Sequence, residues 1–87
     1  MMEMLLTKPT RDEFEVNGDA VCHVPTGYRM HFHPGSRDTG IAEVGEVGRA
    51  LADGRRYEPD DIREMVREVR RTQLARRMFA ADEKEVK

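Results

Sequence analysis

The sequence predicts a small α+β domain: a three-stranded antiparallel β-meander over about residues 12–33, with a long C-terminal helix over about residues 59–83 packed on one face. Two patterns indicate this fold. Apolar residues alternate with period two through the first region, and they recur at helical spacing through the second. A chain of 87 residues has room for one core, so both regions are expected to share it through a glycine-rich connector.

Three alternating segments and two turns indicate the meander. The segments are DEFEV at 12–16, AVCHV at 20–24 and YRMHFH at 28–33. Asn17-Gly18 separates the first two and is a strong hairpin signal. Residues 25–27 separate the second and third, and Pro34-Gly35 ends the sheet.

The faces of the predicted sheet depend on the lengths of its two loops. A strict two-residue Asn-Gly turn would send Glu13 and Glu15 to the core, so we expect a bulged loop of three residues, followed by a second loop of three. In that register Cys22 is buried beside Phe14 and Met30, and all three histidines point to the opposite face. The thiol of Cys22 then acts as a small core hydrophobe.

The helix over residues 59–83 has clear signals at its start. Pro59 suits the first helical position, and the carboxylates of Asp60 and Asp61 suit the positive end of the helix dipole. One apolar stripe is expected to cover the sheet, and it consists of Ile62, Met65, Val66 and Val69.

The connector over residues 34–57 allows two interpretations. Apolar residues between 41 and 51 have helical spacing, but Gly45 and Gly48 would each cost a helix about 1 kcal/mol. Alternatively, Asp53-Gly54 turns a short hairpin into the following Arg-Arg-Tyr. We expect irregular structure with at most one or two turns of helix.

The domain is expected to occupy residues 11–83, between a flexible or edge segment at 1–10 and a frayed tail at 84–87. The N-terminus lacks the features of a signal peptide, and no apolar run is long enough to span a membrane. A single cysteine cannot form an intramolecular disulfide, so we expect a cytoplasmic protein.

Composition and motifs argue against several function classes. The net charge is −2 and the isoelectric point is about 5.9, whereas nucleic-acid-binding domains usually carry a basic excess. The chain has no Walker A loop, no G-x-S-x-G and no H-E-x-x-H. We therefore expect no cofactor and lean against an enzyme.

A weak metal-site signal lies in residues 22–33, which hold the only Cys and all three His. His31 and His33 lie two residues apart on one predicted strand, and Glu15 could approach them. The predicted register points Cys22 away from the histidines, so the simpler interpretation is a solvated sheet face. A metal-dependent enzyme at these residues is the least favoured hypothesis.

An arginine stripe on the helix offers a second possible site. Four side chains that fall on one helical face could contact phosphates: Arg63, Arg67, Arg70 and Arg77. However, acidic residues lie three positions before several arginines, as in Asp60–Arg63, which is typical of a solvated helix. Nucleic-acid binding is therefore the alternative function.

A second apolar patch gives the leading hypothesis. It lies about 160° around the helix from the first stripe, and its residues are Leu74, Met78, Phe79 and Ala81. Gln73 occupies the position where the first stripe would continue. We therefore expect a non-enzymatic interaction module that forms a homodimer, or binds another protein partner, through the second half of the helix. A frayed tail is the alternative.

Overall fold

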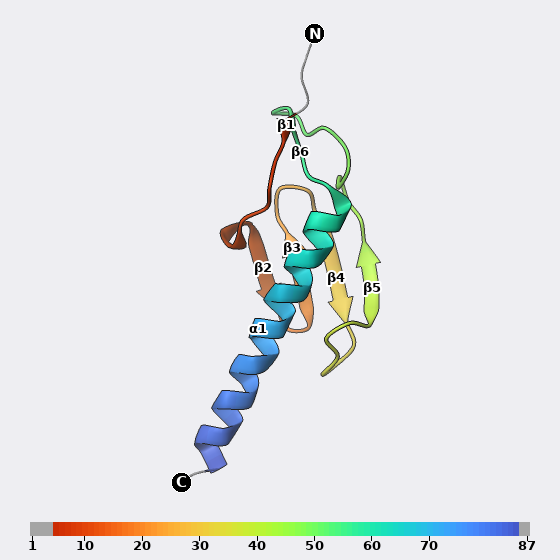
Figure 1. Ribbon diagram of the computed structural model, residues 1–87. Coiled ribbons are helices and arrows are strands. Elements are labelled where there is room, and N and C mark those ends of the chain that lie inside the picture. The colour runs from red at the N-terminus through yellow and green to blue at the C-terminus, as the bar shows by residue number, and fades with distance from the viewer. Residues whose placement is uncertain (1–4, 86–87) are drawn as a thin grey trace.

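The computed structural model describes residues 5–85, and the side chains of residues 6–78. The fold is α+β, as predicted: an antiparallel sheet of order β2-β3-β4-β5 carries helix α1 on one face (Figure 1). A separate parallel pair joins β1 to β6. The elements in chain order are β1 (Leu5–Leu6), a 3₁₀ turn η1 (Arg11–Glu13), β2 (Phe14–Asn17), β3 (Ala20–His23), β4 (Tyr28–Phe32), β5 (Gly40–Glu43), β6 (Arg55–Arg56) and α1 (Pro59–Glu85).

The sheet has four strands rather than three, because part of the connector forms β5. This strand pairs with β4 so that Gly40 lies opposite Phe32. A Cβ atom on Gly40 would collide with the main chain at His31, so glycine permits this close approach. Residues 41–51 form no helix, because Gly45 and Gly48 adopt positive φ angles of 56° and 81° that turn the chain instead.

The register of β3 differs from the prediction, because both hairpin loops have an even number of residues. The first loop is Gly18-Asp19, which leaves Asn17 opposite Ala20. Gly18 has a φ of 61°, as a glycine at the first loop position of a type II′ turn requires. The second loop contains four residues, 24–27.

Because both loops have an even number of residues, the two faces of β3 are exchanged relative to the prediction. Val21 and His23 point into the core, and Cys22 lies half-buried on the opposite face, across from Glu15 and Arg29. The expectation that Cys22 is a core residue is therefore wrong. β2 and β4 nevertheless keep their predicted faces, because the two one-residue errors cancel across β3.

The core lies between this sheet face and the first half of α1. The predicted helix stripe is confirmed, since Ile62, Val66 and Val69 are buried and Met65 packs against them half-buried. The sheet and the segment before the helix supply the remaining buried hydrophobic residues, which are Phe14, Val21, Tyr28, Phe32 and Tyr57.

Arg70 is buried at the edge of this core, with none of its side chain exposed. Its guanidinium donates hydrogen bonds to the carbonyls of Ser36 at 2.8 Å and His33 at 3.3 Å, and lies 3.0 Å from the Asp19 carboxylate. It also stacks over the Phe32 ring, 4.9 Å from the ring centre. Arg70 therefore fastens α1 to both the β2–β3 hairpin and the turn after β4.

We predict that Arg70→Met destabilises the fold by about 2–4 kcal/mol, because it removes the guanidinium donor to the Ser36 carbonyl, one of two donors to the His33 carbonyl and one of two arginine partners of Asp19. Urea unfolding followed by circular dichroism measures the loss. Arg71→Met is the matched control, because Arg71 is the exposed neighbour on the same helix, and its change is expected to stay within about 0.5 kcal/mol. Equal stability of the two variants would contradict the structural role of Arg70.

Candidate functional site

The most highly organised polar cluster in the described structure centres on His23, which has no exposed surface. Its Nε2 atom lies 3.1 Å from Glu13 Oε1, and its Nδ1 atom lies 2.8 Å from Thr26 Oγ1. Glu13 ends η1, His23 ends β3 and Thr26 lies in the β3–β4 loop. Tyr57 lies two residues before the start of α1, and its hydroxyl donates a hydrogen bond to Glu13 Oε2 at 2.8 Å.

The carboxylate of Glu13 is satisfied on both oxygens. Besides His23, Oε1 accepts the backbone N–H of Thr10 at 3.1 Å. Besides Tyr57, Oε2 lies 3.6 Å from the Arg55 guanidinium, which also donates to the Tyr57 hydroxyl at 2.8 Å. The five side chains of this cluster (Glu13, His23, Thr26, Arg55 and Tyr57) are called the His23 network below.

The hydrogen bonds determine the tautomer of His23. An ionised Glu13 only accepts, so the neutral ring carries its proton on Nε2 and accepts the Thr26 hydroxyl proton on Nδ1. The backbone N–H of Tyr28 donates to the same Thr26 oxygen at 3.2 Å. Protonated His23 would also donate from Nδ1, and the Thr26 hydroxyl proton would then lose its acceptor inside the core.

The pKa values of the network follow from this arrangement. Burial lowers the pKa of His23, although the hydrogen bond that its ring donates to Glu13 and the negative charge of Glu13 oppose the change. Burial alone would raise the pKa of Glu13, but hydrogen bonds from His23, Thr10 and Tyr57 outweigh it, and the pKa lies below its usual value. The pKa of Tyr57 is raised, chiefly by burial and to a smaller extent by its hydrogen bond to Glu13 and the negative charge of that carboxylate.

A carboxylate, an imidazole and a hydroxyl in sequence have the composition of a nucleophilic triad. However, Thr26 is only 2% exposed, and its hydroxyl is already engaged as both donor and acceptor. A substrate cannot reach that oxygen without opening the core. The geometry therefore supports a structural clamp that joins η1, the sheet and the start of α1.

Sequence reasoning missed the His23 network for an identifiable reason. The predicted register placed His23, with the other two histidines, on the solvated face. The sequence signal available was the glycine after Asn17, which permits a Gly18-Asp19 loop and moves His23 to the core side. Tyr57, 44 residues from Glu13, gives no local signal of its role.

The metal candidates are not brought together. His31 Nε2 lies 2.9 Å from Glu43 on the neighbouring strand, an exposed pair. Glu15 lies on β2, two strands and about 10 Å away from β4. His33 follows β4 and is exposed. Among the residues that the structure describes, no three His, Cys, Asp or Glu side chains cluster in a way that could hold a metal ion.

The predicted arginine stripe is divided by the fold. Arg63 pairs with Asp60, and Arg67 is exposed. Arg77 lies 3.2 Å from Asp19. The expectation that Arg70 could contact phosphate is wrong, because its guanidinium is buried against main-chain carbonyls.

The predicted interface patch lies in the second half of α1, and Figure 1 shows that the helix continues beyond the end of the sheet. Leu74 is half-buried and Met78 is 69% exposed. Gln73 instead faces the sheet and donates to the Gly18 carbonyl at 2.6 Å, as its place in the helical pattern implied. The side chains of Phe79 and Ala81 lie outside the described residues.

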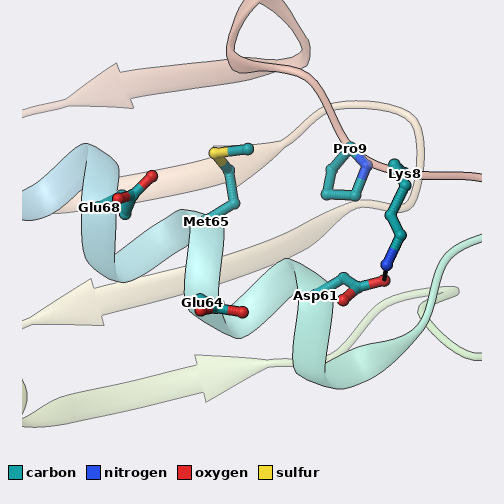
Figure 2. A pocket seen from close by; sticks show the side chains of 6 residues that line it. All are labelled: Lys8, Pro9, Asp61, Glu64, Met65 and Glu68. Carbon is teal, nitrogen blue, oxygen red and sulfur yellow. Dashed lines mark hydrogen bonds and ion pairs between the residues drawn. The ribbon is translucent and has the colours of Figure 1, made fainter.

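A pocket between the N-terminal segment and the first half of α1 is acidic. Figure 2 shows Lys8 reaching Asp61, which its ammonium contacts at 3.1 Å, with Pro9 and Met65 nearby. Glu64 and Glu68 complete the lining. Lys8 is largely exposed, so its ion pair contributes little to stability.

Comparison of this chain with protein-family models, with curated proteins and with solved structures found no match. Between residues 5 and 85, no helix combines the length and the apolar character that crossing a membrane requires.

We predict that the free energy of unfolding falls as the pH drops below about 6.5. The unfolded chain takes up a proton on His23 near its ordinary pKa of 6.5, while burial keeps the folded ring neutral to lower pH. The stabilisation is therefore complete above about pH 6.5 and is lost as the pH falls from there toward the lowered pKa. Urea unfolding between pH 7.5 and 5 measures it.

His23→Gln is expected to cost about 1–2 kcal/mol at neutral pH and to remove this part of the pH dependence. His33→Gln is the matched control, because His33 is exposed, and it should keep the wild-type profile. A profile that is the same in wild-type protein and His23→Gln would show that His23 does not titrate on unfolding.

Proposed function

We propose that this protein is a non-enzymatic interaction module that self-associates through the second half of α1. The observation that carries the proposal is the half-buried Leu74 beside the exposed Met78, on a helix that continues past its own sheet. An exposed apolar patch on a small, charge-rich domain usually marks an interface. With its single cysteine, the module suits a reducing compartment such as the cytoplasm.

A second copy is the simplest partner for this patch. A two-fold axis brings each Leu74 and Met78 against the same residues of the other chain, so one surface serves both subunits. Antiparallel helices are favoured, because Arg67 and Arg71 lie on the same helical face as the patch, nearer the start of α1, and in a parallel pair they would lie opposite the same positive charges of the second chain. Phe79 and Ala81 remain part of the proposed interface from the sequence pattern alone.

The nucleic-acid alternative has less support. Of its four arginines, Arg70 is buried and Arg77 shares Asp19 with it. Arg63 pairs with Asp60 in the same helix. Only Arg67 remains exposed without an ion pair among the described residues, which is too little charge for a phosphate-tracking surface.

We predict that Leu74→Glu with Met78→Glu converts a homodimer to a monomer. Each substitution occurs twice across a two-fold interface, so four carboxylates replace apolar contacts, and the dissociation constant should rise at least about a hundredfold. Light scattering over a concentration series measures the mass. Circular dichroism checks that the sheet and first half of α1 remain folded.

The matched control is Thr72→Glu with Arg76→Gln. It has the same four-residue spacing and the same change in net charge, on the opposite face of the helix. It should leave the mass unchanged. Wild-type protein that is monomeric at high micromolar concentration would overturn the homodimer proposal.

A further inference from the structure

A groove of about 340 Å³ lies between the second half of α1 and the β2 side of the sheet. Val16 and Val69 form its apolar part, and Thr72 and Gln73 border it. Three arginines complete the lining: Arg11, Arg76 and Arg77. We propose that this groove binds an acidic, extended peptide segment of another protein.

The charge of the groove selects for an acidic partner. None of the described residues that line it is a carboxylate. Arg77 pairs with Asp19 outside the groove, and Arg11 donates to the carbonyl of Phe14 at 3.1 Å. Arg76 is exposed and makes no hydrogen bond or ion pair within the described part of the chain. Two guanidinium groups of the groove, those of Arg11 and Arg76, therefore have no carboxylate partner among the side chains that the structure describes, and a guanidinium binds a carboxylate through paired hydrogen bonds.

The acidic pocket in Figure 2 shows that the positive charge of the groove does not extend along the whole of α1. It lies against the first half of the same helix, and Asp61, Glu64 and Glu68 line it with a single lysine. A negatively charged segment is repelled there and attracted to the second half of α1. The helix thus offers two adjoining surfaces of opposite charge, and only one of them suits an acidic partner.

The floor of the groove suits a peptide with apolar side chains. Val16 is 37% exposed on the helix side of the sheet, above the buried Val69. Burying an aliphatic side chain on this floor adds a hydrophobic contribution between the flanking charges. No aromatic ring is among the described residues that line the groove, so it offers no stacking platform for nucleotide bases.

The main chain of β2 suits an extended peptide. β2 is an edge strand, paired only with β3. The Glu13 carbonyl accepts the N–H of Val24 at 3.0 Å, so main-chain groups at Glu13 point toward β3. Because these groups alternate in an antiparallel pair, those of Phe14 and Val16 point to the open edge. The Phe14 carbonyl is used by Arg11, which leaves Val16 to pair with an added strand.

This inference rests on the proposed role as a protein-binding module, but it uses a different surface. Thr72 and Arg76 lie about 160° around α1 from Leu74 and Met78. Peptide binding and self-association can therefore be measured independently of each other. A protein that stays monomeric and binds the peptide contradicts the homodimer alone, and a homodimer that does not bind it contradicts the groove alone.

The test uses a fluorescent peptide of about eight residues in which Glu and Val take turns at every second position, so that both lie on one face of the extended chain, with Thr at the positions between. It is titrated with the full-length protein and followed by anisotropy. We expect saturable binding that weakens with salt, and at least about tenfold weaker binding by Arg11→Gln with Arg76→Gln. Arg67→Gln with Arg71→Gln carries the same charge change on another face of α1 and should stay within about twofold of wild type. Arg76→Gln alone is the second variant, which should fold normally because Arg76 makes no hydrogen bond or ion pair among the described residues.

Two further probes separate the alternatives. The same peptide with Lys in place of Glu should not bind, and the amide signal of Val16 should shift in the ¹⁵N spectrum when the Glu peptide is added. No saturable binding of the Glu peptide, or equal weakening by both double variants, would overturn the proposal. Tighter binding of an oligothymidine that displaces the peptide would overturn it in favour of a nucleic-acid surface.

Discussion

The buried imidazole of His23 is the constraint on which the rest of the fold depends. It occupies a core position, where a polar ring is tolerated only because both nitrogens are hydrogen-bonded. Meeting that condition requires Glu13 from η1 and Thr26 from the next loop, and Glu13 in turn requires Tyr57. Three segments far apart in the sequence are held together by one polar network, while the apolar core packs beside it.

Arg70 plays the corresponding part farther along α1. Tyr57, just before the helix, is tied to the side of the sheet near η1, and Arg70 is tied to the β2–β3 hairpin and the turn after β4. Between them the contacts of α1 with the sheet are apolar, and apolar contacts tolerate repacking. The two polar attachments therefore specify where along the sheet α1 lies, which the apolar stripe does not determine by itself.

The fold class, the helix and its buried stripe could be predicted from the sequence, because each follows from the local spacing of apolar residues. The face of β3 could not, since it depends on whether the two adjoining loops are odd or even, and the sequence Asn17-Gly18-Asp19 allows both. β5 was missed because three of its four residues, Gly40, Ala42 and Glu43, are of types depleted in strands, and the strand forms where a glycine lets two main chains approach. The roles of His23 and Arg70 follow from contacts across many residues, which no local pattern encodes.

The order of the strands has a consequence for how the chain reaches this fold. β2, β3, β4 and β5 each pair with the next strand in sequence, so the main sheet closes only short loops. By contrast, Leu5 pairs with Arg55, across about half of the chain. Short-range pairings form fast, and long-range pairings must first overcome the entropy of loop closure. The meander is therefore expected to assemble early, with β1 joining β6 as the final step and the first to reopen when the protein fluctuates.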